Sequence, residues 1–427
     1  MTDRTAHPEA VPAASAPIIP LALFRCLFGC LFAALAAGCA QTGGTQTGAA
    51  DTNAAQNRSP RPVTSAATED RAPLVTEIHG ATIVHDDWAD LGYRWDWATV
   101  PYIDRGAGVE HLDSDRGHVF TMDSNSWLTT IDASSGRRIW QLRVADRLSS
   151  FLDTRVVGDR TVLVTSRSRL HGFDIQTGNR NLNMRPELVS STEPLMFGPV
   201  YVSGSPSGRV QGHRILDNAG EPLTGSLRDG LPVWQYRIDG AVRAAPVDVG
   251  GVAAFVSQNG QILFVDPTTG SATGRGRIAG GMSTDPVTDG RVLYIASEDQ
   301  SVYAYTPDGS RLWRYRTPDP LRTQPMIHDG ALYLTIPSEG FVALDASSGE
   351  RRWANDRIRG EAVAVRAGEL IVWDHDSRIV RSVQPSTGDV IAEAELAGYR
   401  DMIASEPVDG RLYALAESGA IVAFIPR

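Results

Sequence analysis

Short runs in which apolar and polar residues alternate recur along most of the chain after about residue 90. The clearest example pairs Arg291–Ala296 with Ser301–Tyr305, and four polar residues separate the two runs. Alternation with a period of two, rich in branched and aromatic residues, is typical of β-strands, and short polar interruptions are typical of turns. The same arrangement recurs at Ala331–Thr335 with Gly340–Leu344. The pattern therefore predicts an all-β chain of antiparallel strands.

A short sequence tag follows many of these hairpins. It reads Asp-x-x-Ser/Thr-Gly, and in its strongest copies a tryptophan stands four residues after the glycine. The tag residues are Asp132, Gly136 and Trp140; Asp174 and Gly178; Trp234; Asp266 and Gly270; Gly309 and Trp313; Asp345, Gly349 and Trp353; and Gly388. The spacing of the tag glycines is 39 to 42 residues, except for one gap of 92 that holds a degenerate copy before Trp234. Six units therefore cover 252 residues, with a mean of 42 residues each.

This repeat predicts a β-propeller, because four strands in a unit of about 42 residues make one propeller blade. Residues 91–427 hold about eight such units, so we predict eight blades of four antiparallel strands, with seven blades as the alternative. A further tag would fall at the last residue, which leaves the last unit with three strands. Tyr93–Val100 carries tag-like tryptophans, and we predict that it supplies the missing strand and closes the ring.

The tag itself has a mechanical explanation. Aspartate and Ser/Thr side chains accept hydrogen bonds from nearby backbone N–H groups, and glycine permits a positive φ. The tryptophan then opens the next strand and can pack its ring against the neighbouring blade. We therefore interpret the tag as a structural element and not as a ligand site.

The N-terminal segment has the pattern of an export signal. Leu27–Ala37 is an apolar run of 11 residues, shorter than the roughly 20 that a membrane-spanning helix needs. It ends at Leu35–Cys39, which resembles the bacterial lipobox. That resemblance implies cleavage before Cys39 and a lipid on the Cys39 thiol, and the alternative is an uncleaved anchor helix.

The residues after Cys39 are low in sequence complexity. Residues 39–72 are rich in Ala, Thr, Gly, Gln and Ser, a composition that cannot bury a core and predicts a flexible tether. We therefore divide the chain into a lipoprotein signal peptide at 1–38, a tether at 39–72 and a propeller at 73–427.

Composition and charge exclude several functions. All 40 basic residues are arginine, which excludes mechanisms that need lysine. The formal charge of −10 argues against binding to nucleic acid. The three cysteines lie within the first 39 residues, so residues 40–427 offer no disulfide, thiolate zinc site or thiol nucleophile. The nine histidines show no pair at metal-binding spacing, and we predict neither a metal site nor a catalytic residue.

The tag resembles the tryptophan-docking repeat of the quinoprotein, or PQQ-like, propellers over roughly residues 91–427. One exported group with this repeat is the quinoprotein alcohol dehydrogenases. Another is BamB, the lipid-anchored, cofactor-free propeller of the outer-membrane β-barrel assembly machine. A lipobox, a tether and a single propeller make this chain resemble the second group. The dehydrogenases place a vicinal disulfide over the quinone, which residues 40–427 cannot form. We therefore expect neither an enzyme nor a PQQ cofactor.

A segment after the second tag adds to this resemblance. Leu182-Asn-Met184-Arg185-Pro-Glu187 is similar to the Leu-x-Leu-Arg-x-Glu stretch with which BamB proteins contact their barrel-forming partner. The resemblance implies that Leu182, Met184 and Arg185 contact this partner, and the alternative is an ordinary loop between blades. The acidic patch that accompanies the stretch in that family is missing, since the corresponding connection reads Asp239-Gly-Ala-Val-Arg-Ala-Ala245.

The expected function is that of a monomeric propeller scaffold for protein–protein interaction, with a β-barrel assembly protein as partner. Its lipid on Cys39 would hold it at the outer membrane facing the periplasm, or at the cell surface membrane of a host with a single membrane. Two alternatives stay open at this point. They are a PQQ-dependent oxidoreductase and a surface propeller that binds polysaccharide or peptide.

Overall fold

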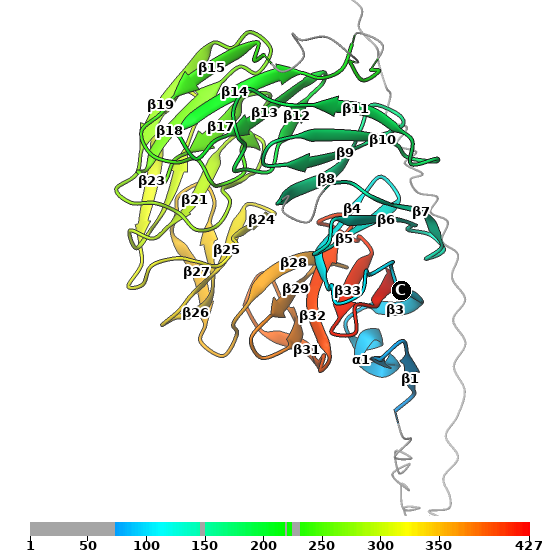
Figure 1. The fold of residues 1–427 in the computed structure, drawn as a ribbon. Helices are drawn as coiled ribbons and strands as arrows, with labels where there is room; N and C mark the ends of the chain where they lie inside the picture. The colour runs from blue at the N-terminus through cyan, green and yellow to red at the C-terminus, as the bar shows by residue number, and fades with distance from the viewer. Residues whose placement is uncertain (1–72, 146–149, 218–219, 224–230) are drawn as a thin grey trace, which may run out of the picture. The chain divides into compact units, whose positions relative to one another are not determined.

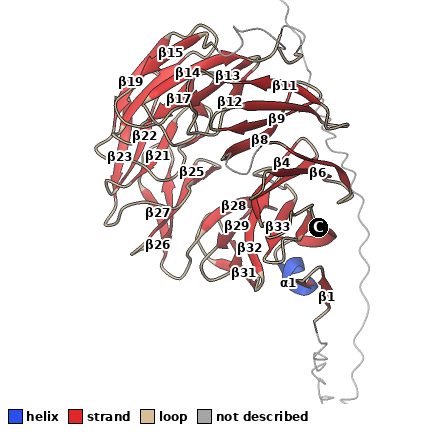
Figure 2. Ribbon diagram, in the orientation of Figure 1, coloured by secondary structure: helices blue, strands red, loops and turns tan. Residues whose placement is uncertain are grey.

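The computed structural model describes residues 73–145, 150–217, 220–223 and 231–427. The predicted signal peptide, Cys39 and the predicted tether lie outside these residues. The described chain forms eight sheets of four antiparallel strands, one two-stranded hairpin and one short helix (Figure 1). Figure 2 shows how completely strands dominate it. None of the described helical residues form a helix with the length and apolar character needed to cross a bilayer.

Seven blades are continuous in sequence, and their strands pair in chain order. Blades 1 to 4 are β4 (Val109–Asp115), β5 (His118–Asp123), β6 (Trp127–Asp132) and β7 (Arg138–Arg143); β8 (Phe151–Val157), β9 (Thr161–Ser166), β10 (Leu170–Asp174) and β11 (Arg180–Met184); β12 (Leu195–Phe197), β13 (Val200–Gly204), β14 (Arg209–Arg214) and β15 (Trp234–Arg237); and β16 (Val247–Asp248), β17 (Ala253–Val256), β18 (Gln261–Val265) and β19 (Ala272–Arg277).

Blades 5 to 7 are β20 (Val287–Thr288), β21 (Leu293–Ser297), β22 (Ser301–Tyr305) and β23 (Arg311–Arg316); β24 (Met326–His328), β25 (Ala331–Ile336), β26 (Gly340–Asp345) and β27 (Arg351–Asn355); and β28 (Glu361–Arg366), β29 (Glu369–Asp374), β30 (Ile379–Val383) and β31 (Val390–Glu395). The first strands of neighbouring blades contact one another around the centre of the ring, as β28 does with β32 and β4 does with β8.

The two faces of the ring carry different turns, because successive strands run in opposite directions. Turns between first and second strands, and the tags between third and fourth strands, lie at one face, which we call the tag face. Turns between second and third strands, and the connections from blade to blade, lie at the opposite face, which we call the connection face.

Both ends of the propeller sequence build blade 8. It comprises β32 (Tyr399–Ala404), β33 (Leu412–Ala416), β34 (Ile421–Pro426) and, as its outer strand, β3 (Tyr93–Thr99). β3 runs antiparallel to β34, with Thr99 opposite Ile421. In Figure 1 the blue N-terminal strand β3 lies beside the red strands of the chain's end. The predictions of an all-β, eight-bladed propeller and of closure by the N-terminal strand are confirmed, and the seven-bladed alternative is wrong.

One arginine side chain contacts both of the chain segments that close the ring. Arg366, at the end of β28, donates from Nε to the Gly92 carbonyl at 2.9 Å and from Nη2 to the Arg427 carbonyl at 2.5 Å. Its Nη1 lies 2.7 Å from the Asp409 carboxylate. One guanidinium, 14% exposed, therefore joins blade 7 to both of the chain segments that close the sheet, at the edge where they meet.

At five of the eight junctions a tryptophan docks one blade on the next. Trp140 donates from Nε1 to the Ile175 carbonyl of the following blade at 2.7 Å, and its ring covers Gly178, where an added Cβ would lie 3.0 Å from the ring. The same contact joins Trp97 to Ala133 and Gly136, Trp234 to Pro267 and Gly270, Trp313 to Ala346 and Gly349, and Trp353 to Pro385 and Gly388.

The tag aspartates hold the turns that present these glycines. Asp132 accepts hydrogen bonds at Oδ1 from the backbone N–H groups of Ser134 and Ser135, at 3.1 and 2.9 Å. Asp174, Asp266 and Asp345 make the equivalent bonds in their own tags. The tag glycines have φ between +69° and +87°, a region that disfavours any side chain.

An N-terminal cap precedes the closing strand. It consists of β1 (Val75–Ile78), β2 (Ala81–Val84) and the helix α1 (His85–Asp90). Trp88 of α1 stacks on Phe424 with ring centroids 3.5 Å apart, and the Tyr399 hydroxyl donates to the Thr82 carbonyl at 3.0 Å. The cap therefore covers apolar surface of blade 8 that would otherwise meet solvent.

Candidate partner-binding site

The junction of blades 2 and 3 is one of those without a docking tryptophan, as are the junctions that follow blades 4 and 7. In blade 2 the position four residues after the tag glycine holds Leu182 in place of tryptophan, so no indole docks on blade 3. Leu182 and Met184 are each 4% exposed and pack with Leu163 and Tyr201 in an apolar cluster between these two blades. The assignment of Leu182 and Met184 to a partner contact is therefore corrected: both side chains point into the interblade core.

The other residues of the segment are on the surface. Arg185, Glu187 and Val189 are all exposed on the connection face. The segment is fixed at its far end, because the Ser190 N–H donates to the Arg167 carbonyl at 2.8 Å and Ser190 Oγ contacts the Tyr201 hydroxyl at 3.1 Å. A partner contact through this segment therefore depends on Arg185 and its exposed neighbours.

Behind this segment the interface between blades 2 and 3 holds polar groups without hydrogen-bond partners. Gln211 and His213 project from β14 on the same side as Tyr201, toward blade 2, and both are fully buried. Within the described part of the chain, neither the side-chain amide atoms of Gln211 nor the Thr165 hydroxyl has a hydrogen-bond partner. Burial lowers the pKa of His213 to about 4, so the imidazole is neutral. The interface between blades 2 and 3 therefore buries polar side chains among its apolar residues.

The tag face of the same junction is hollowed. A pocket of about 680 Å³ lies there, lined by residues of blades 1, 2 and 3. Val156, Val157 and Leu216 form much of its apolar lining, and Arg116 and Arg155 contribute its cations. Val157 and Leu216 also belong to the interblade cluster, so the pocket is the open end of that interface.

A group of charged residues lies on the first strands and connections of blades 1 to 3, toward the centre of the ring. Arg155 Nε donates to the Asp153 carboxylate at 2.6 Å, and Asp153 is almost completely buried. Burial and the Asp153 charge raise the pKa of Asp113 to about 7. Glu193 is reached by solvent, but the protein crowded around it, together with Asp153, raises its pKa to about 7 as well. The single guanidinium of Arg155 therefore leaves negative charge here incompletely balanced.

Replacement of Asp113 by asparagine should reduce the pH dependence of stability. The folded protein holds the Asp113 proton more tightly than the unfolded chain does, so the stability that the protonated group contributes is lost as the pH rises from about 4 through 7. Between pH 5 and pH 8, the free energy of unfolding of Asp113→Asn should rise by about 1–2 kcal/mol relative to that of wild type. This figure allows for solvent screening. Urea unfolding at both pH values measures this, with the exposed Asp376→Asn as control. Equal pH profiles for Asp113→Asn and wild type would contradict it.

In blades 4 to 7, the residues just before or at the start of each first strand are joined from blade to blade by hydrogen bonds. Asp285 accepts from the Ala245 N–H at 2.6 Å, Gln324 accepts from the Asp285 N–H at 3.1 Å, and Glu361 accepts from the Gln324 N–H at 2.8 Å. Each side chain therefore satisfies the backbone of the preceding blade. These hydrogen bonds between blades were not predicted from the sequence. A signal for them was available, because a polar residue precedes proline at Glu193, Asp285 and Gln324.

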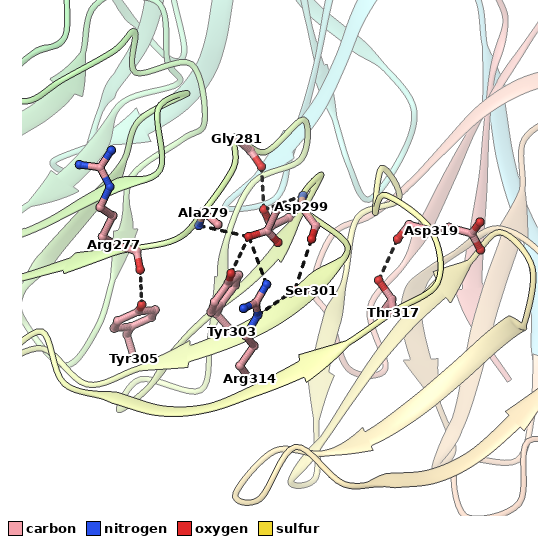
Figure 3. Close-up of polar contacts among 11 residues, drawn as sticks. Arg277, Ala279, Gly281, Asp299, Ser301, Tyr303, Tyr305, Arg314, Thr317 and Asp319 are labelled. Carbon is pink, nitrogen blue, oxygen red and sulfur yellow. Dashed lines mark hydrogen bonds and ion pairs between the residues drawn. The ribbon is translucent and has the colours of Figure 1, made fainter.

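The connection face of blade 5 is also tightly paired. Figure 3 shows Asp299 accepting hydrogen bonds at Oδ2 from the Tyr303 hydroxyl at 2.5 Å and from the Ala279 N–H at 3.1 Å. Arg314 Nη2 lies 3.7 Å from the same carboxylate oxygen, and its Nε donates to Ser301 Oγ at 3.0 Å. The arginine in this network is therefore neutralised locally and fixes the turn to the preceding connection.

The residues present do not fit a quinone cofactor of the kind that the dehydrogenases hold. Residues 40–427 contain no cysteine for the disulfide over the quinone. Across the described ranges, no three His, Cys, Asp or Glu side chains come together as metal ligands. We therefore derive no step through such a group.

The fold and its docking contacts define the class of the protein: it is a β-propeller of PQQ-like repeats. The family model described as outer membrane protein assembly factor BamB matches residues 74–307 and 258–427. The chain belongs to that family, which confirms the resemblance seen in its sequence.

Several relatives carry the same description. The outer membrane protein assembly factor BamB of Salmonella typhimurium is 28% identical over 249 residues, 53% of this chain and 58% of the relative. Those of Bordetella pertussis and Burkholderia pseudomallei are 24% and 25% identical over 196 and 127 residues, which are 42% and 29% of this chain and 51% and 33% of the relatives. The chain therefore matches between a third and somewhat over half of the length of these relatives. The computationally designed Ika8 protein superposes with a TM-score of 0.60 at 10% identity, covering 77% of this chain and all of that one, a likeness of fold alone.

Proposed function

We propose that this chain is a non-catalytic propeller scaffold in the assembly of outer-membrane proteins, and that it binds a β-barrel assembly protein through the connection between blades 2 and 3. The observation that carries the proposal is the family match over residues 74–427, taken with a rigid ring that exposes Arg185 at this connection. Rigid blades hold such a segment in one conformation, so little conformational entropy is lost when a partner binds it.

The proposed location is the periplasmic side of the outer membrane, with a lipid on Cys39 as the anchor. The lipobox-like stretch supports the anchor, and the family description supports the membrane. Tethering raises the effective concentration of the propeller near a membrane partner. Cells grown with a palmitate analogue should label the wild-type protein but not Cys39→Ser. Label that persists in Cys39→Ser would rule out lipidation at this residue.

Cross-linking in native membranes tests the partner. The tagged full chain should recover a β-barrel assembly protein, identified by mass spectrometry. Arg185→Glu should reduce that recovery about fivefold or more, because a reversed charge removes attraction and adds repulsion. Arg357→Glu is the matched control, since Arg357 is an exposed arginine on the connection face of another blade. Recovery of polysaccharide or unrelated peptide without a barrel-assembly protein would replace this proposal with a surface-binding propeller.

A further inference from the structure

Six arginines gather on the connection face of blades 2 and 3, in turns and connections far apart in sequence. We call them the arginine surface: Arg167, Arg169, Arg185, Arg209, Arg237 and Arg243. All are exposed except Arg209, which is half-buried.

Backbone contacts join the segments that carry these residues. The Ser190 N–H donates to the Arg167 carbonyl at 2.8 Å, which places the Arg185 segment on the turn that holds Arg167. One residue on, Ser191 Oγ donates to the Val242 carbonyl, next to Arg243. The arginine surface therefore spans two blades without interruption by another blade.

Among the described residues, these guanidinium groups lack ionic partners. None of the six forms an ion pair with any residue that the structure describes. Elsewhere on the connection face arginines are paired, as Arg314 is with Asp299 at 3.7 Å and Arg322 is with Glu298 at 3.4 Å. Figure 3 shows the first of these pairs. Arg316 and Arg357, which are also exposed on the connection face, form no ion pair with a described residue either, so blades 2 and 3 differ in the number of unpaired arginines that gather there.

Two of the six arginines face each other across neighbouring strands, an arrangement that lowers stability. Arg209 of β14 and Arg237 of β15 stand directly opposite each other in the antiparallel ladder. Like charges at such a position repel and destabilise the sheet. Neither guanidinium makes a hydrogen bond to a described residue, so no such contact within the described chain offsets this repulsion.

The local charge is opposite in sign to the charge of the whole chain. The formal charge of the chain is −10. In the turns and connections that carry the six arginines, the carboxylates are Glu187 and Asp239, with Glu193 further toward the centre of the ring, so positive charge is in excess there. A cationic area on an anionic body concentrates anionic partners at one place and repels them elsewhere.

We propose that the arginine surface binds an acidic polypeptide segment of the assembly partner. This inference rests on the proposed function and adds the chemistry of the partner. A flat anionic membrane would meet the whole connection face, including the exposed Glu298 and Asp356 of blades 5 and 6. A polypeptide segment can instead cover blades 2 and 3 alone. Planar guanidinium groups suit carboxylates because they can donate two parallel hydrogen bonds.

The experiment measures binding of the purified full chain to the host's β-barrel assembly protein at several salt concentrations. Arg167→Glu combined with Arg243→Glu should weaken binding about tenfold or more and should reduce its salt dependence. Arg357→Glu should bind within about twofold of wild type. The substituted positions are exposed and make no side-chain hydrogen bonds to described residues, so the fold should tolerate them, and a thermal melt verifies this. Binding of wild type and the double variant to vesicles of phosphatidylethanolamine and phosphatidylglycerol is measured in parallel, to test whether the surface binds an anionic membrane instead.

The outcomes separate this inference from the proposed function. If wild type binds the assembly protein and the double variant binds equally well, the arginine surface has no role and the proposed function stands. If wild type does not bind the assembly protein at all, both fail. If the double variant loses binding to vesicles but not to the assembly protein, the surface binds lipid and the inference is overturned.

Discussion

Trp313→Ala should lower the free energy of unfolding by about 3–5 kcal/mol, the range for truncation of a buried large aromatic residue. Trp313 is 9% exposed, donates to the Ala346 carbonyl at 2.9 Å and covers Gly349 of the next blade. Its removal therefore creates a cavity and removes a hydrogen bond and a ring contact between blades 5 and 6. Urea unfolding monitored by circular dichroism measures the loss.

Leu312→Ala is the matched control for this substitution. Leu312 is the neighbouring residue on β23 but is 50% exposed, so its truncation should change stability by no more than about 0.5 kcal/mol. A loss below about 1 kcal/mol for Trp313→Ala would mean that the docking contact does not stabilise the ring.

Arg366→Ala should weaken the closure of the ring by about 2–3 kcal/mol, because it removes hydrogen bonds from a largely buried cation to the two strands β3 and β34 where they meet. Hydrogen exchange of the β3 amides should rise more than that of β25, since the loss is confined to the closing sheet. Thermal unfolding and exchange together measure the effect.

Arg351→Ala provides the comparison. Arg351 also pairs with a carboxylate, Glu339 at 2.8 Å, but it is 49% exposed, and exposed pairs contribute about 0–1 kcal/mol. If Arg366→Ala destabilises the protein no more than Arg351→Ala does, then pairing of β3 with β34 alone closes the ring.

Local patterns in the sequence predict most of the fold. Alternation fixes the strands, and the tag identifies both the end of each hairpin and the tryptophan that docks on the next blade. The closing strand was recognisable because Trp95 and Trp97 repeat the tag tryptophan without a preceding tag. These features are local, so a single sequence contains them in full.

The candidate site was less predictable, for two physical reasons. Leu182 and Met184 alternate with Asn181 and Asn183 along β11, and this period of two indicated buried side chains more strongly than the resemblance indicated a contact. Arg209 and Arg237 face each other because of the register in which β14 pairs with β15. An insertion separates these two strands in the sequence, so their register cannot be deduced from residue spacing.

The pairing of β3 with β34 also has a consequence for how the protein folds. More than three hundred residues separate the two strands in the chain, so their contact closes a very long loop and can form only after almost the whole propeller sequence is available. Until then blade 8 lacks its outer strand, and Trp97 cannot pack near Tyr413. An unfinished or damaged chain therefore keeps a strand edge and apolar surface open to chaperones and proteases, and only a complete chain withdraws them.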